Sequence, residues 1–166
     1  MLRLRKNSRG FTLIELLVVI SIIGLLSSVV LASLTSARVK ARDAKRKATL
    51  HQLATANELY FNDVGSYPWF NGWVHNSAPS FGGLVPAYIS TVPYDPLYPG
   101  DSNYQHWRKD YRGYTCMTLN DASRYGFYAK LENPSTSDPN YISPTVGDSF
   151  DRCVATNWEM NYKRGN

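Results

Sequence analysis

Proline is absent between Phe11 and Asn62, and Gly24 is the only glycine in this range. Because proline interrupts a helix and glycine weakens one, their scarcity allows a single helix to run through the whole range. The helix is expected to end at Gly65, since glycine readily adopts the left-handed conformation of a helix cap. Pro68 supports the same boundary, because it restricts the preceding residue to extended geometry.

Catalytic and metal-binding patterns are also lacking. The histidines form no pair at metal-ligand spacing, and there is no phosphate-binding loop, dinucleotide fingerprint or nucleophile elbow. Three aspartates near the C-terminus do not have the spacing of a calcium loop. The histidines are His51, His75 and His106, and the aspartates are Asp138, Asp148 and Asp151. We therefore expect neither an enzyme nor a bound cofactor or metal.

Acidic side chains are absent from the first ten residues, which contain four basic ones. The formal net charge of the chain is +5, so this leader supplies most of it. A second stretch, residues 38–47, carries six basic side chains and one acidic one, whereas the residues from Ala48 onward have a net charge of −3. Because nucleic-acid affinity depends largely on neutralising phosphates, this distribution argues against direct nucleic-acid binding. The stretch 38–47 is expected to contact lipid headgroups and to pack within the protein, with subunit pairing or polyanion binding as alternatives.

The sequence does contain a long apolar run, from Phe11 to Leu34. As a helix it would extend about 36 Å, enough to cross a hydrocarbon core of roughly 30 Å. The basic leader would keep the N-terminal end in the cytoplasm, so the rest of the chain would face outward. One charged side chain, Glu15, interrupts the run and would cost about 2.5 to 3.5 kcal/mol at the bilayer centre. A cleaved secretory signal and a simple anchor are alternatives, although an ordinary signal is shorter and lacks an acid.

The string GFTLIE at residues 10–15, placed between the basic leader and the apolar run, resembles the class III signal of type IV prepilins and type II secretion pseudopilins. The resemblance implies that prepilin peptidase cleaves after Gly10 and methylates the new N-terminal residue, Phe11. It also implies that Glu15 meets the N-terminal amine of a neighbouring subunit during assembly. An ammonium partner would offset the cost of burying the carboxylate.

Three further features bear on this resemblance. Residues 88–96 are similar to the segment that crosses under the sheet in major pseudopilins and Gram-positive-type pilins. Many relatives have a proline at the position of Ala32, so the helix in this chain is expected to stay continuous there. The acidic, DG-rich calcium loop of major pseudopilins is missing.

Two cysteines, Cys116 and Cys153, lie in the part of the chain expected outside the cytoplasm. An oxidising compartment and an even number of cysteines favour a disulfide, with two free thiols as the alternative. Many pilins close a C-terminal loop with one disulfide, so the resemblance also favours the bridge.

We expect an α+β fold, in which the long N-terminal membrane-spanning helix packs on a small C-terminal antiparallel sheet. An apolar stripe on the outer part of the helix should face the sheet. It consists of Leu50, Leu53, Ala54, Asn57 and Phe61, with Tyr60 at its edge. Strands are predicted at 111–118, 125–131 and 155–162, a short helical turn at 84–89, and loops over roughly 40 residues after Pro68 and at 133–152.

The predicted organisation has four parts. They are a cleaved cytoplasmic leader at 1–10, a transmembrane and filament-core helix at 11–35, an outer amphipathic helix at 36–63 and a globular head at 64–166. The predicted function is that of a structural subunit of a type IV pilus. A pseudopilin of a type II secretion or DNA-uptake system is one alternative, and a membrane-tethered glycan-binding module that does not polymerise is another.

The predicted partners are other copies of the chain, prepilin peptidase, the inner-membrane assembly platform, minor pilins and the membrane. The precursor is expected in the cytoplasmic membrane, crossing it once with its C-terminal domain outside. It would then enter an extracellular pilus or a periplasm-spanning pseudopilus.

Overall fold

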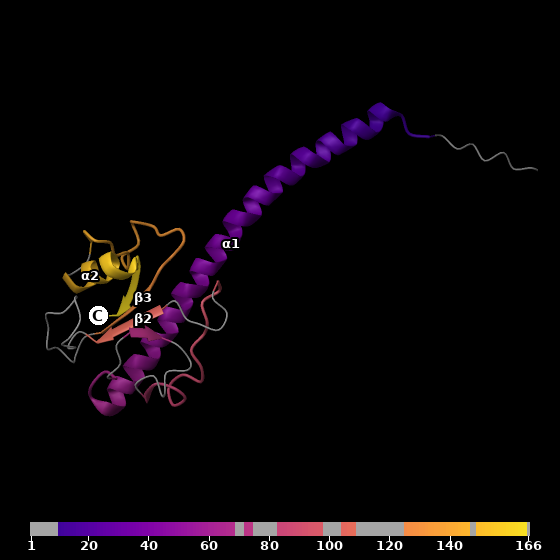
Figure 1. Cartoon of the computed structure of the whole chain (residues 1–166). Coiled ribbons are helices and arrows are strands. Elements are labelled where there is room, and N and C mark those ends of the chain that lie inside the picture. Colours follow the sequence, from indigo (N-terminus) through magenta and orange to yellow (C-terminus); the bar gives the residue numbers. More distant parts are fainter. Residues whose placement is uncertain are drawn as a thin grey trace, which may run out of the picture. The chain divides into compact units, whose positions relative to one another are not determined.

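The computed structural model describes residues 10–68, 72–74, 83–97, 104–108, 125–146 and 149–165 (Figure 1). The described elements are α1 (Leu13–Val64), β1 (Gly72–Val74), β2 (Tyr104–Arg108), β3 (Tyr125–Ala129), α2 (Ser149–Trp158) and β4 (Tyr162–Gly165). The chain divides into an N-terminal unit, Met1–Arg38, and a C-terminal unit, Val39–Asn166.

Helix α1 is uninterrupted from Leu13 to Val64, including the segment between Gly24 and Ala32. Gly65 ends the helix with φ 78°, and its amide donates a hydrogen bond to the Phe61 carbonyl at 2.7 Å. This is the left-handed cap predicted from the sequence, and it confirms the expected end of the helix to within two residues.

Hydroxyl side chains in the apolar part of α1 donate to backbone carbonyls of the preceding turn. The Ser21 hydroxyl donates to the Leu17 carbonyl at 2.8 Å, and the Thr35 hydroxyl donates to the Leu31 carbonyl at 3.0 Å. Each of these polar groups therefore has a partner within its own helix, which is a requirement for a segment surrounded by lipid.

The four described strands of the C-terminal unit form an antiparallel sheet in the order β1-β2-β3-β4. In its register, Phe127 of β3 lies opposite His106 of β2 on one side and Arg164 of β4 on the other. All five residues of β3 are buried. Strand β3 is therefore the central element of the domain, with side chains enclosed on both faces of the sheet.

One face of the sheet packs against the outer turns of α1 (Figure 1). Leu50 and Leu53 of the helix are fully buried together with Phe127 and Ala129 of β3. The predicted apolar stripe is confirmed, and so is the prediction that alternate residues of the 125–131 segment meet it. Leu84 and Val92, from the segment that follows β1, complete this core.

The other face of the sheet carries a second core, built around α2. Tyr128 packs there with Ile142, Val154 and Met160, and its hydroxyl donates to the Asp151 carboxylate at 2.8 Å. Gly126 makes this possible, because a Cβ at that position would lie 2.4 Å from the Tyr128 hydroxyl oxygen. The sheet is thus covered on both faces, whereas the sequence predicted only the α1 side.

Several predicted boundaries were wrong. Residues 155–162 were expected to be a strand, but the first half of them, 155–158, belong to α2, and the last strand is Tyr162–Gly165. Strands β1 and β2 lie in a region expected to be loop, and α2 begins inside the predicted loop 133–152. The turn at 84–89 is confirmed by the hydrogen bond from the Tyr88 amide to the Leu84 carbonyl at 2.9 Å. The strand predicted at 111–118 lies outside the described residues.

Candidate processing and assembly site

The predicted cleavage site, Gly10–Phe11, lies immediately before α1. The space in which Gly10 would carry a Cβ is open, and Phe11 is 90% exposed. The peptide bond between the two residues is therefore accessible in this unit. The roles assigned to these residues stay predictions.

Glu15 has a hydrogen-bonding partner within its own chain. Its carboxylate accepts a hydrogen bond from the Thr12 amide at 2.7 Å and another from the Thr12 hydroxyl at 2.8 Å. In return, the Glu15 amide donates to the Thr12 hydroxyl oxygen at 3.2 Å. This is the reciprocal capping box of a helix N-terminus. The capping role of Thr12 was not predicted from the sequence, although threonine followed three residues later by glutamate is the usual signal of a capping box.

The first turns of α1 expose apolar side chains on every face of the helix. Leu13 is 83% exposed and Leu26 is 60% exposed. The most apolar 18-residue window of the helix has a mean hydropathy of 2.6, and none of its residues is buried. Helix α1 is therefore long and apolar enough to cross a membrane. This apolar surface has no partner within the described part of its own chain.

In the basic stretch 38–47, half of the basic side chains form ion pairs with acidic residues of the same domain. Arg46 is central: its side chain is 2% exposed and forms ion pairs with Asp43 at 2.8 Å, Asp95 at 2.7 Å and Glu132 at 2.9 Å. We call these four residues and Arg42, which pairs with Glu132 at 2.6 Å, the ionic cluster. Packing within the protein, one part of the prediction, is thus confirmed for these residues.

The ionic cluster ties three segments together. Asp43 accepts hydrogen bonds from the backbone amides of Glu132 and Asn133 at 2.9 and 2.8 Å. Asp95 accepts one from the Leu97 amide at 2.9 Å while it binds Arg46. Helix α1, the 83–97 segment and the loop after β3 are therefore fixed to one another by charged groups and backbone amides.

Electrostatic effects in the cluster follow from these contacts. Burial alone would lower the pKa of Arg46, but hydrogen bonds to Asp95 and Glu132 outweigh burial and raise that pKa. The hydrogen bond from Arg42 lowers the pKa of Glu132 to about 2, with burial opposing the shift and Arg46 adding to it. Arg42, Arg46 and Glu132 are therefore charged at neutral pH.

The aspartates considered as calcium ligands bind lysines where the structure describes them. Asp138 pairs with Lys47 at 2.6 Å, and Asp151 pairs with Lys163 at 3.1 Å. Asp148 lies outside the described residues. No cluster of three or more metal-binding side chains occurs among the residues that the structure describes.

The predicted disulfide and the histidines are only partly covered by the described residues. Cys153 lies on α2, whereas Cys116 lies outside the described ranges, so the bridge stays a prediction. His51 is exposed on α1, and His106 lies in β2. His75 is outside the described residues.

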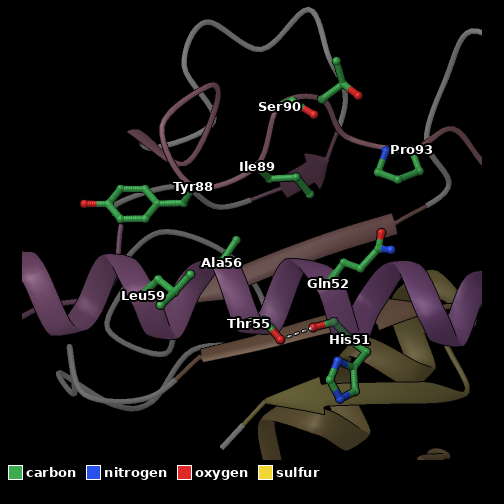
Figure 2. Close-up of a pocket in the computed structure, with 10 residues that line it drawn as sticks. His51, Gln52, Thr55, Ala56, Leu59, Tyr88, Ile89, Ser90 and Pro93 are labelled. Atoms are coloured by element: carbon green, nitrogen blue, oxygen red, sulfur yellow. Dashed lines mark hydrogen bonds between the residues drawn. The ribbon is translucent and has the colours of Figure 1, made fainter.

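A shallow groove runs along the outer part of α1 (Figure 2). Gln52, Thr55 and Leu59 line it from the helix, and Tyr88 and Ile89 line it from the segment opposite. None of its lining residues is acidic, lysine or arginine. The groove is therefore suited to close packing with another surface rather than to binding an ion.

Comparison with known proteins agrees with these features. Residues 5–31 match a family model described as a prokaryotic N-terminal methylation motif. The chain is 44% identical over 62 residues to a type IV wide pilus major component of Thermus thermophilus, covering 37% of this chain and 47% of that protein. It is 26% identical over 136 residues to a type IV major pilin of Myxococcus xanthus, covering 80% of this chain and 58% of that protein. No solved structure matches the chain.

One relative matches along almost its entire length. The type II secretion system core protein G of Escherichia coli is 32% identical over 170 residues, which cover 98% of this chain and 99% of that protein. By contrast, the chain spans about half the length of the two pilus proteins.

An exposed apolar N-terminal helix, a methylation motif and an α+β head with an antiparallel sheet define a prepilin-like protein. The chain belongs to the family of type IV pilins and type II secretion pseudopilins. Its relatives are named as pilus and secretion-system components rather than as enzymes.

Proposed function

We propose that the chain is a structural subunit of a type IV pilus-like filament and polymerises through the N-terminal half of α1. The observation that supports this most is the all-round exposure of the apolar side chains that follow the Gly10–Phe11 bond. Covering them requires lipid first and other copies of the helix later. The subunit would wait in the cytoplasmic membrane with its head outside, and its partners would be prepilin peptidase, the assembly platform and minor pilins.

Processing and assembly are assigned to different residues. Cleavage after Gly10 by prepilin peptidase would remove the basic leader, and Phe11 would then be methylated. Glu15 would turn from its own Thr12 towards the N-terminal amine of a neighbouring subunit. A carboxylate and an ammonium attract strongly away from water, so this contact would favour one register of neighbouring helices.

The test uses the full chain, expressed with a filament assembly machinery. Gly10→Ala should leave the leader attached, as seen by intact mass, and should abolish filaments. Glu15→Ala should be cleaved normally but should not assemble. Ser21→Ala, a change of a small side chain in the same helix, serves as the control. This variant should be cleaved normally and should assemble into filaments. Normal filaments from both Gly10→Ala and Glu15→Ala would refute the proposed roles.

A type II secretion pseudopilus is the second candidate, and one observation favours it. The match to the core protein G of Escherichia coli covers 99% of that protein, whereas the matches to the two pilus proteins cover 47% and 58% of theirs. Electron microscopy of intact cells separates the candidates. Long surface fibres that contain the chain support a pilus. The absence of such fibres, together with a loss of protein secretion when the chain is deleted, supports a pseudopilus.

The disulfide Cys116–Cys153 is proposed as a brace of the head. Closing a loop of this length would stabilise the folded state by roughly 3 to 4 kcal/mol in the loop-closure model. Alkylation of both thiols in the folded, unreduced protein would exclude the bridge.

A further inference from the structure

The exposed face of α1 in the C-terminal unit carries opposite charges at its two ends. Lys45 and Asp63 are both exposed and lie eighteen residues apart in the sequence. At 3.6 residues per turn, this is about five full turns, so both residues lie on the same face, roughly 27 Å apart along the axis. The helix residues that line the groove, Gln52, Thr55 and Leu59, lie between Lys45 and Asp63 in the sequence. Figure 2 shows Gln52 and Leu59 on the helix, with Tyr88 and Ile89 on the segment opposite.

The two charged ends differ in how they are satisfied. Lys45 directly precedes Arg46 and Lys47 in the sequence. Those two residues form ion pairs, whereas Lys45 has none in the part of the chain that the structure describes. Asp63 accepts a single hydrogen bond, from the Tyr88 hydroxyl at 2.9 Å, and no described basic side chain pairs with it. Each end therefore has capacity for a partner of opposite charge outside its own chain.

From this pattern we propose that the groove and Asp63 of one copy receive the Lys45 turn of a second copy of the chain. The inference rests on the proposed filament function, which supplies parallel neighbouring copies. Two parallel helices in the same register would bring Lys45 of each copy together, which like-charge repulsion disfavours. A stagger of eighteen residues instead brings Lys45 of one copy to Asp63 of the other.

The same stagger places small against large side chains. Ala41 of one copy lies opposite Leu59 of the next, because these residues are also eighteen positions apart. Leu59 is 52% exposed and Ala41 is exposed, so a neighbour can cover Leu59 without a steric clash. The aliphatic stem of Lys45 can pack beside Tyr88 while its ammonium reaches Asp63.

The contact joins two different ends of one helix face, the Lys45 end of one copy and the Asp63 end of the other. A contact between unlike surfaces repeats from copy to copy, and it produces an open filament unless the rotation closes a ring. The 88–93 segment that forms one wall of the groove is held in place by the Arg46–Asp95 ion pair of the ionic cluster. The receiving surface is therefore formed before the neighbour arrives.

A charge exchange tests the contact in the full chain with its assembly machinery. Lys45→Asp and Asp63→Lys should each reduce filament yield at least about fivefold, because each places like charges together. The double exchange should restore the yield to within about twofold of the unmodified chain. Lys40→Asp is the matched control, because Lys40 is exposed on the same helix but lies about 140° around the axis from Asp63. Its effect should not be rescued by Asp63→Lys.

Cysteine crosslinking tests the stagger independently. Chains with Ala41→Cys and Leu59→Cys together should form a ladder of disulfide-linked multimers in oxidised filaments, and chains with either change alone should not. Ala48→Cys with Leu59→Cys is the control, since Ala48 lies about 10 Å further along the helix.

The possible outcomes separate this inference from the proposed function. If the unmodified chain makes no filament, the proposed function fails. If the unmodified chain makes filaments but the exchange gives no rescue and the ladder is absent, only the staggered contact is overturned. Equal, unrescued losses for Lys40→Asp and Lys45→Asp would assign these lysines to lipid headgroups and would also overturn it.

Discussion

The two halves of α1 belong to one helix but have opposite surroundings. In the N-terminal half, large apolar side chains such as Leu16 and Leu26 are exposed on every face. In the outer half, Leu50 and Leu53 are fully buried against the sheet. An all-round apolar helix needs a partner outside its chain, whereas an apolar stripe can be covered by the chain itself. The N-terminal half is therefore left uncovered by its own chain, whereas the outer half takes part in the folding of the head.

Charged groups follow the same division. The described N-terminal half up to residue 37 contains one acidic side chain, Glu15, which is satisfied locally by Thr12. The outer half contains Arg46, which is satisfied by residues from two distant segments. Changes at buried positions of the outer half should therefore alter folding stability, whereas changes in the first half should alter assembly and leave the folding of the head intact. The following predictions test this division.

The largest expected effect is that of Arg46→Met. The change leaves Asp43 and Asp95 buried without their cationic partner, and breaking a buried ion pair in this way typically costs about 3 to 5 kcal/mol. Chemical unfolding of the full chain in detergent, followed by circular dichroism, measures the loss. Lys45→Met is the control and should change the free energy of unfolding by less than about 0.5 kcal/mol. Similar values for the two variants would contradict the importance of the ionic cluster.

A pair of leucine truncations compares the two halves directly. Leu53→Ala removes a fully buried side chain and should destabilise the head by about 2 to 5 kcal/mol. Leu26→Ala, at an exposed position of the N-terminal half, should leave unfolding of the head unchanged within about 0.5 kcal/mol. The same denaturation assay measures both. If Leu26→Ala destabilises the head as much as Leu53→Ala, the two halves do not have separate roles.

Replacing Asn57 should have a smaller effect than the changes above, and it should stabilise the protein rather than destabilise it. The residue is fully buried on α1, and neither polar atom of its side chain has a hydrogen-bond partner in the described part of the protein. Leaving such a group unsatisfied costs about 1 to 3 kcal/mol, so Asn57→Leu should raise the free energy of unfolding by about that amount. Asn62→Leu, at an exposed position of the same helix, should have little effect. A loss of stability in Asn57→Leu would show that the amide has a structural role.

The smallest effect concerns acid stability through Glu132. Its pKa is lowered to about 2, chiefly by the hydrogen bond from Arg42. A glutamate in the unfolded chain has a pKa of about 4.3, so the stabilisation is complete above that value. It should be lost as the pH falls towards 2. The difference in stability between the natural chain and Glu132→Gln should therefore be constant from pH 7 to pH 5 and should shrink below pH 4. A difference that vanishes between pH 7 and pH 5 would contradict the lowered pKa.

Local signals in the sequence accounted for much of the fold. The end of α1 at Gly65, the buried stripe and strand β3 each depend on residues close together in the chain. The C-terminal region was misassigned because Trp158, Met160 and Tyr162 alternate with polar residues, a pattern that favours a strand. Phe150, Val154 and Trp158 recur every four residues, which is a helical spacing that the strand assignment overlooked. Strand β2 was missed because Tyr104–Arg108 mixes polar and aromatic residues.

The candidate processing and assembly residues were predicted from one motif and stay predictions, whereas the ionic cluster was not predicted. The GFTLIE string has a specific order of residues, so Gly10, Phe11 and Glu15 could be selected without a structure. Arg46 instead meets Asp95 and Glu132, which are 49 and 86 residues away in the sequence. A run of basic residues gives no sign of which acids will approach it, and the run was therefore assigned to lipid headgroups and to packing with unnamed partners.

The distance in sequence between Arg46 and its partners also bears on kinetics. Bringing together groups 49 and 86 residues apart requires long loops to close, and such contacts tend to form after the local structure of α1. An interaction that is absent from the folding transition state slows unfolding and has little influence on the folding rate. The ionic cluster therefore governs how long the head, once folded, keeps its structure more than how quickly it reaches it.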